Sequence, residues 1–439
     1  MANYLFLRGN RNKRFFMDIA EELIDRGHNC HLIKLELGEL LFKSKIQTIF
    51  APFHVTKQEY PISDKTLLKM KIYNITYQRN VLKKDVSKKE LAIYKRYMLF
   101  IDQYIEKHSI DAVCLFNGYH WIDQITKYIA QKRGLKTFYF EDGLFRPYTI
   151  TCDEKGINAN ASISKDGEFF DKIKIDSNKL TEYLFKPQDE EIFKKTKENL
   201  SKVALVKGIS MIGSAINISP KLYVHITLWQ AIKYFVFKQT FRRKRNDDIK
   251  LPDEYIFVPF QVSRDTQIFY NSKSIKDMKL LLQTVLEAVH EYNMLHGKNI
   301  KLIIKEHPED MSRNNYSELK KEYENVEEVI FVKKTNMKQM LNRALAVITI
   351  NSTVGIEALT MHKKVITLGD ALYNIDGVAV HCEKPSKLKK ILPITLNKDV
   401  NKERIDKFLY YLRFFYQVEG NINNSSRKTA ENVANRIEF

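Results

Sequence analysis

The sequence predicts an α/β fold with two Rossmann-like domains that face a central cleft. Short apolar runs alternate with helical patterns in the N-terminal half, and the same alternation starts again near residue 253. This alternation is typical of a parallel sheet with helices on both faces. The length of 439 residues and a hydrophobic content of 44% suffice for two or three domains with real cores, and they exclude a disordered chain.

The first half of the chain begins the alternation at its N-terminus. Ser87 is expected to cap a long helix, and Glu90 to complete a capping box with it. Gly27 and Gly134 each follow a helical pattern, and glycine is common directly after the last residue of a helix. Strands are expected at 4–7, 30–35, 111–116 and 136–140, and helices at 15–25, 87–108 and 122–132.

The second half has the same pattern, although no internal sequence repeat is evident. A final helical stretch at 405–418 is expected to pack back across the domains. Strands are expected at 255–262, 300–305, 329–332, 345–350 and 365–368, and helices at 275–295, 337–343 and 354–359. The predicted parts are an N-terminal domain (1–190), a helical connecting segment (191–252), a C-terminal domain (253–404) and C-terminal helices (405–439).

The chain is strongly basic. Subtracting 53 Asp and Glu residues from 72 Lys and Arg residues gives a formal net charge of +19. Such an excess indicates a polyanionic partner: nucleic acid, an anionic membrane surface or phosphorylated substrates. The charge alone does not choose among them.

The cysteine and hydropathy patterns favour a reducing, cytoplasmic setting. The four cysteines are widely spaced, so they form neither a disulfide framework nor a zinc motif. The N-terminal apolar run is too short for a signal peptide, and we expect no transmembrane helix. The cysteines are Cys30, Cys114, Cys152 and Cys382.

Residues 221–245 combine many aromatic side chains with a basic end at 242–245. An amphipathic helix of this composition can lie in a membrane interface. A core-packed linker helix with a solvated basic end explains the same residues, and the sequence leaves both interpretations open.

Polar residues follow one apolar strand of the first half. Glu141, Asp142 and Arg146 come directly after the strand expected at 136–140. Ligands bind at the carboxyl ends of strands in open α/β sheets, and adjacent carboxylates can be held at different pKa values for acid and base work. An ordinary acidic turn at Gly143 is the alternative.

Two further polar groups follow strands of the second half. Gln261 and Asp265 come after the first strand, where Asp265 is either a nucleophile, a base or a helix cap. Lys305, His307 and Pro308 come after the second, where a Lys and a His can both donate to phosphate oxygens. His307 on its own is equally explained as a loop histidine, and nothing in its spacing indicates a metal site.

A fourth group lies between a strand and a helix near residue 350. Amide groups at a helix start, together with two hydroxyls, form a phosphate site without a P-loop. Simple helix capping by a hydroxyl is the alternative. The group comprises Asn351, Ser352, Thr353 and Glu357.

All four groups lie at the carboxyl ends of expected strands, one in the first domain and three in the second. This is the layout of a GT-B glycosyltransferase. The segments FEDGLFRPYTIT, GINANAS, FQVSRDTQI, IKEHPED, AVITINSTVGIEAL and TLGDALYNIDGV occur in this order over residues 138–378. In these segments the chain resembles the bacterial capsule polysaccharide biosynthesis family, and within it the single-module β-Kdo transferases of the KpsS/LipB type.

The resemblance implies a retaining transfer of β-Kdo from CMP-Kdo to a lyso-phosphatidylglycerol-based glycolipid, which builds the linker of a capsular polysaccharide. It implies Asp265 as the nucleophile. Retention needs two inversions, so a second group must deprotonate the acceptor, and Glu141 is the candidate. His307, Lys305, Ser352 and Thr353 would hold the CMP phosphate. The predicted catalytic set is Asp265, Glu141 and His307, and the predicted substrate-binding set is Asp142, Arg146, Gln261, Lys305, Pro308, Asn351, Ser352, Thr353 and Glu357.

We expect no metal and no other cofactor, because CMP leaves as a monophosphate. The implied partners are the CMP-sugar donor, the phospholipid acceptor, the inner face of the inner membrane, a second capsule Kdo transferase and the capsule exporter. Two other functions stay open. One is a GT-B transferase with another CMP- or CDP-linked donor, such as a polyol-phosphate transferase. The other is a protein without chemistry that binds nucleic acid or scaffolds at a membrane, although no nucleic-acid motif supports it.

Overall fold

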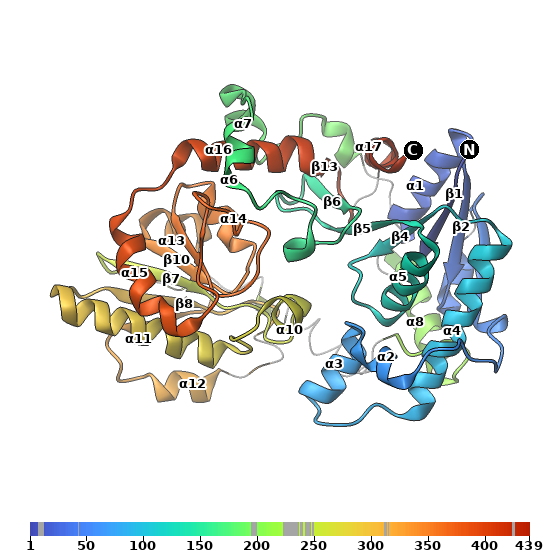
Figure 1. The fold of residues 1–439 in the computed structure, drawn as a ribbon, viewed down its shortest axis with the longest axis horizontal. Helices are drawn as coiled ribbons and strands as arrows, with labels where there is room; N and C mark the ends of the chain where they lie inside the picture. Colours follow the sequence, from blue (N-terminus) through green and yellow to red (C-terminus); the bar gives the residue numbers. More distant parts are fainter. Residues whose placement is uncertain are drawn as a thin grey trace. The chain divides into compact units, whose positions relative to one another are not determined.

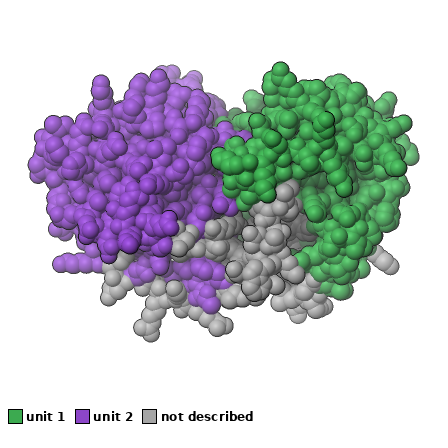
Figure 2. Space-filling model, turned by 90° about the horizontal axis from the view of Figure 1, so that it is seen from below, with its two compact units in different colours: residues 1–162, 176–225, 412–439 green, residues 163–175, 226–411 purple. Residues whose placement is uncertain are grey.

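The computed structural model describes residues 1–7, 13–42, 44–194, 200–222, 237, 240–241, 247, 250–310, 314, 316–423 and 426–439. The chain divides into two compact units, shown in separate colours in Figure 2. Unit 1 comprises residues 1–162, 176–225 and 412–439, and unit 2 comprises residues 163–175 and 226–411. Most of the segment 221–245 lies outside the described residues, so its two interpretations stay predictions.

Unit 1 is built on a sheet in the order β13-β6-β5-β4-β1-β2-β3 (Figure 1). The strands from β5 to β3 pair in parallel, whereas β6 and β13 run antiparallel to their neighbours. The sheet is therefore mixed, and the prediction of a purely parallel sheet is wrong at this edge. The strands are Asn3–Leu7 (β1), Asn29–Lys34 (β2), Gln47–Phe50 (β3), Ala112–Phe116 (β4), Lys136–Asp142 (β5), Thr149–Asp153 (β6) and Val418–Glu419 (β13).

Helices cover both faces of this sheet because successive strand residues point to opposite sides. Phe138 and Phe140 face α1 and α17, whereas Tyr139 faces α5, whose Lys127 lies over its ring. The helices are Lys13–Asp25 (α1), Asp64–Lys69 (α2), Tyr73–Asn80 (α3), Lys88–Lys107 (α4), Trp121–Arg133 (α5), Ser177–Tyr183 (α7), Leu200–Ala215 (α8) and Arg427–Ile437 (α17), with short turns at Leu37–Leu41 (η1), Ala51–Phe53 (η2), Asn158–Asn160 (η3), Glu190–Phe193 (η4) and Leu412–Tyr416 (η6).

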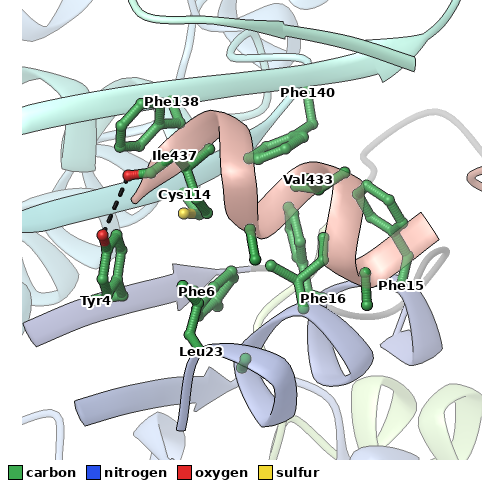
Figure 3. Close-up of a cluster of buried hydrophobic side chains, with 14 of the residues drawn as sticks. Tyr4, Phe6, Phe15, Phe16, Leu23, Cys114, Phe138, Phe140, Val433 and Ile437 are labelled. Atoms are coloured by element: carbon green, nitrogen blue, oxygen red, sulfur yellow. Dashed lines mark hydrogen bonds between the residues drawn. The ribbon is translucent and has the colours of Figure 1, made fainter. Parts of the chain in front are cut away.

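The last helix of the chain completes the core of the first unit. In Figure 3, Val433 and Ile437 of α17 lie among phenylalanines of β5 and α1, and the Tyr4 hydroxyl donates to the Ile437 carbonyl at 3.1 Å. Val433 and Phe16 are fully buried in this cluster. Residues that are more than 400 positions apart therefore share one hydrophobic core.

Unit 2 is built on a parallel sheet in the order β12-β11-β10-β7-β8-β9. Its strands are Tyr255–Pro259 (β7), Lys301–Lys305 (β8), Val329–Val332 (β9), Ala346–Thr349 (β10), Lys364–Thr367 (β11) and Val380–His381 (β12). Its helices are Gly167–Asp171 (α6), Thr266–Asn271 (α10), Met278–His296 (α11), Ser317–Glu322 (α12), Met337–Arg343 (α13), Val354–Leu359 (α14), Leu388–Asn397 (α15) and Lys402–Tyr411 (α16), with a turn at Pro385–Lys387 (η5). The predictions of an α/β class and of two Rossmann-like domains, the pair from which a GT-B enzyme is built, are confirmed.

The units divide the chain differently from the predicted domains, and they split the predicted connecting segment 191–252 between residues 225 and 226. Residues 163–175 were expected in the N-terminal domain, but the structure groups them with unit 2, where the guanidinium of Arg404 donates to Asp171 and Phe170 packs on Phe408. The C-terminal stretch divides near residue 412, so only its second part belongs to unit 1.

One predicted cap is half right. The Ser87 hydroxyl accepts from the Glu90 amide at 3.2 Å, as expected of an N-cap. The Glu90 carboxylate instead accepts from the Gln78 amide group and from the Tyr94 hydroxyl. The predicted capping box is therefore wrong, because Gln78 and Tyr94 hold the glutamate instead.

Phe16 tests the contribution of the shared core to stability. We expect Phe16→Ala to lower the free energy of unfolding of unit 1 by about 3–5 kcal/mol, because it leaves a cavity between α1 and β5. Phe53→Ala is the matched control, since Phe53 is 68% exposed, and it should cost about 0.5 kcal/mol or less. Urea unfolding followed by circular dichroism measures both, and equal losses would contradict this packing.

Candidate functional site

The buried carboxamide of Gln261 joins the ends of two neighbouring strands in unit 2. Gln261 follows β7, and its oxygen accepts from the Asn351 amide at 3.0 Å and from the Thr349 hydroxyl at 3.3 Å. Its nitrogen donates to the Asn351 side-chain oxygen at 3.0 Å. Two residues that were predicted to bind substrate therefore hold each other in place, which fixes the loop after β10 against the loop after β7.

Asp265 lies at the start of α10, in the loop after β7. Its carboxylate accepts from the Gln267 amide at 2.9 Å and from the Thr266 hydroxyl at 3.2 Å, so it caps the helix. Burial raises the pKa of Asp265, although these two hydrogen bonds and the charge of His307 lower it in part. The cap holds one carboxylate oxygen and fixes the side chain, which is compatible with a chemical role for the other oxygen.

Lys305 and His307 lie at the carboxyl end of β8, next to the Asp265 loop. Burial lowers the pKa of His307, while the carboxylate charges of Glu309, Asp310 and Asp265 raise it in part. Burial likewise lowers the pKa of Lys305, with Glu357 and Glu306 acting in the opposite direction. Both side chains are half-buried. An anionic ligand would stabilise their protonated forms.

Glu306 and Asp310 belong to the same turn as His307, but their side chains contact other protein groups and stabilise the turn. Glu306 is buried and forms an ion pair with Lys320 of α12. The Asp310 carboxylate is buried and accepts from the Ser263 hydroxyl at 3.2 Å and from the Asn314 side chain at 2.8 Å. The sequence analysis assigned no role to Asp310, although this residue ends the segment IKEHPED.

Ser352 and Thr353 form the turn between β10 and α14. The Ser352 hydroxyl accepts from the Val354 amide at 3.2 Å, and the Tyr373 hydroxyl donates to the Ser352 carbonyl at 2.5 Å. Tyr373 is buried against Gly355, where an added Cβ would lie 2.3 Å from the Tyr373 hydroxyl. Thr353 stands at the cap position without a side-chain capping bond. Because Gly355 has no Cβ, the Tyr373 hydroxyl can approach closely enough to donate to the Ser352 carbonyl.

In unit 1 the two adjacent carboxylates are separated by the sheet. The structure extends β5 through Asp142, because β6 pairs with it, so Glu141 and Asp142 point to opposite faces. Glu141 accepts from the Asn117 side chain at 2.6 Å, whereas Asp142 accepts from Asn423 at 3.3 Å. The expectation that both leave the strand end together is therefore wrong.

Glu141 has the environment of a candidate base. Burial and the charge of Asp142 raise its pKa, while the hydrogen bonds from the Asp142 amide and Asn117 and the charge of Arg146 lower it in part. Arg146 is exposed, and its guanidinium donates to the Gly143 carbonyl at 3.0 Å. A glutamate with a raised pKa accepts a proton at neutral pH more readily than an exposed one does.

The described residues contain no group of three or more His, Cys, Asp or Glu side chains that could hold a metal ion. Within the same residues, no helix combines the length and the apolar character that are needed to span a bilayer. The four cysteines are buried thiols.

Comparison with known proteins identifies a family. A family model described as capsule polysaccharide biosynthesis protein matches residues 111–393, which is more than half of the chain. The chain is 27% identical to the capsule polysaccharide export protein KpsS of Escherichia coli over 288 residues, which cover 62% of this chain and 70% of that one. It is 24% identical to the capsule polysaccharide modification protein LipB of Neisseria meningitidis serogroup B over 307 residues, 65% of this chain and 70% of that one.

Among solved structures, the chain is similar to the Thermosulfurimonas dismutans KpsC β-Kdo 2,7-transferase. The sequence identity is 16% and the TM-score 0.37, over 86% of this chain and 98% of that one. The MurG of Acinetobacter baumannii is another similar structure, with 10% identity and a TM-score of 0.34 over 100% of this chain and 99% of that one.

Proposed function

We propose that this chain, which belongs to the capsule polysaccharide biosynthesis protein family, is a retaining glycosyltransferase. It transfers β-Kdo from CMP-Kdo to a lyso-phosphatidylglycerol-based glycolipid. The observation that carries the proposal is the pairing in unit 2 of a capped, half-buried carboxylate, Asp265, with the Lys305–His307 pair at the end of the next strand. The pairing supplies a fixed nucleophile and two cation-forming groups for a phosphate.

The first step forms a bond between a carboxylate oxygen of Asp265 and the anomeric carbon of Kdo. The bond from that carbon to the CMP phosphate breaks, and CMP leaves with the electron pair. The Gln267 amide and the Thr266 hydroxyl hold the carboxylate for this attack. Lys305 and protonated His307 offset the charge that develops on the phosphate.

The second step transfers Kdo from Asp265 to the acceptor hydroxyl. Glu141 of unit 1 takes the proton of that hydroxyl, whose oxygen attacks the anomeric carbon and releases the Asp265 carboxylate. Two inversions at one carbon give overall retention. The raised pKa of Glu141 suits it to this exchange, because a base is most effective when its pKa lies near the working pH.

Other predicted residues take supporting roles in this proposal. Gln261 and Asn351 position the two loops of the donor site through their mutual hydrogen bonds. Ser352 and Thr353 bind the CMP phosphate, and Pro308 shapes the His307 turn. Glu357 binds the ribose, and its charge acts on Lys305. Arg146, which is exposed, binds the Kdo carboxylate or an acceptor phosphate, and Asp142 has no step in the mechanism.

The second candidate is a transferase that uses another CMP- or CDP-linked donor, such as a polyol phosphate. The His307–Pro308 turn and the hydroxyls of Ser352 and Thr353 favour it equally, because these groups would recognise a phosphate and not a sugar. A donor screen with purified protein separates the two. Turnover of CDP-linked polyols without turnover of CMP-Kdo would favour the alternative.

We also propose that the protein docks peripherally on the cytoplasmic face of the inner membrane. Helix α8 exposes Leu205 and Ile212, and the turn after it exposes Ile216, each more than half accessible. Residues 200–222 contain three lysines and no acidic residue. Apolar side chains flanked by lysines match an anionic leaflet.

The nucleophile is tested by Asp265→Asn. We expect transfer of Kdo to a lyso-phosphatidylglycerol acceptor to fall by at least about 10³-fold, because the amide cannot form the glycosyl ester. Asn is also a good N-cap, so the fold should be kept. Release of CMP and formation of the Kdo-lipid are measured together.

The matched control is Asp277→Asn. Asp277 likewise caps a helix, α11, by accepting from the Leu280 backbone amide at 2.8 Å, and it has no place in the mechanism. It should keep wild-type turnover. Substantial turnover by Asp265→Asn would remove Asp265 as the nucleophile.

Proton uptake on CMP binding tests the role of His307. The pKa of His307 is lowered in the free protein, so the ring is neutral at pH 7, and a bound phosphate raises that pKa. CMP should therefore bind with proton uptake and lose affinity as the pH rises. Calorimetric titration in two buffers of different ionisation enthalpy measures the uptake.

The uptake should disappear in His307→Gln and persist in His290→Gln, which alters an exposed histidine of α11. Equal uptake by wild type and His307→Gln would show that another group titrates.

A further inference from the structure

A small basic pocket lies on the α5 face of the unit 1 sheet. Its volume is about 120 Å³, which corresponds to roughly four water molecules of liquid. Lys71, Lys127 and Lys155 line it together with carboxamides and tyrosines, and no acidic residue is among its described lining residues. A concave site with three ammonium groups attracts a compact anion.

The backbone and aromatic side chains shape this pocket. Asn117 and Gly118 follow β4 with positive φ angles of 67° and 79°, so the chain turns sharply over the ring of Tyr139. An added Cβ on Gly118 would lie 2.9 Å from that ring. Lys127 of α5 lies over the other part of the same ring, 5.2 Å from its centroid. Tyr139 therefore packs against both the turn at Asn117 and Gly118 and the ammonium group of Lys127, and all of these residues line the pocket.

Two of the pocket lysines repel each other. Lys127 is half-buried, and both burial and the neighbouring charge of Lys71 lower its pKa. A bound anion would relieve both effects. The pocket also adjoins the candidate base, because Asn117 lines it and donates to Glu141 at 2.6 Å.

We propose that this pocket binds the phosphodiester of the acceptor lipid and so presents an acceptor hydroxyl to Glu141. The inference rests on the proposed function, which it deepens by assigning the phosphate subsite. A tetrahedral phosphate offers oxygens in several directions, which suits three ammonium groups from separate elements, whereas a carboxylate offers two in one plane. The volume holds a phosphate and its ester atoms but not a nucleotide.

The test is direct binding of sn-glycero-3-phosphoglycerol, the deacylated headgroup, by calorimetry. Lys127→Gln and Lys155→Gln should each weaken binding about tenfold, because each removes a charged donor to the phosphate. Lys155 is exposed on a loop, so its variant tests the site without a risk to folding. Lys89→Gln, on the exposed surface of α4, makes the same change in net charge and should bind like wild type.

Three further arms separate the alternatives. If inorganic phosphate binds more tightly than the headgroup, the assignment to a lipid is wrong. If the two lysine variants lose affinity for free Kdo and keep their affinity for the headgroup, the assignment to a phosphate is wrong. Unchanged headgroup affinity in both lysine variants would overturn the site itself. If wild type binds the headgroup through these lysines but does not transfer Kdo, the subsite stands and the proposed function is wrong.

Discussion

The candidate donor site depends on the hydrogen bonds of one buried carboxamide, that of Gln261. A glutamine buried at the end of β7 must satisfy both its oxygen and its nitrogen, and Thr349 and Asn351 do so from the end of β10. These contacts fix the turn that carries Ser352, while Asp310 fixes the His307 turn to the loop that contains Ser263. Asp265 leaves this framework as a helix cap, with its orientation already determined. Preorganisation of this kind lets polar groups stabilise a transition state without rearrangement.

The core of unit 1 combines parts of the chain that are far apart in the sequence. The C-terminal helix α17 packs between α1 and β5, so the first and last helices stabilise one another. The mixed edge of the sheet has a functional consequence. Because β6 pairs with β5, the strand continues through Glu141 and Asp142 and sends them to opposite faces. Glu141 then shares the α5 face with the basic pocket, and Asp142 is removed from it.

Much of the architecture follows from sequence patterns. Strand and helix periodicity predicted the elements around Gly134 and Gly297, where left-handed caps end α5 and α11. The groups at 261–265, 305–308 and 351–357 were located because polar residues follow apolar strands. The strand at 418–419 could not be predicted, since two residues carry no periodic signal. The pocket around Lys127 could not be predicted either, because its three lysines come from three separate segments that only the fold brings together.

Part of the net charge of +19 lies in three lysines around the unit 1 pocket and three lysines within residues 200–222, and we propose that both groups contact a phosphate-bearing lipid. The proposed mechanism depends on one covalent step, in which Asp265 carries Kdo during transfer. Intact-protein mass spectrometry after incubation with CMP-Kdo, without acceptor, tests it most directly. We expect an added mass of one Kdo residue, located in the peptide that contains Asp265 and absent from Asp265→Asn. Efficient transfer to acceptor with an inverted product and no adduct on wild type would contradict it.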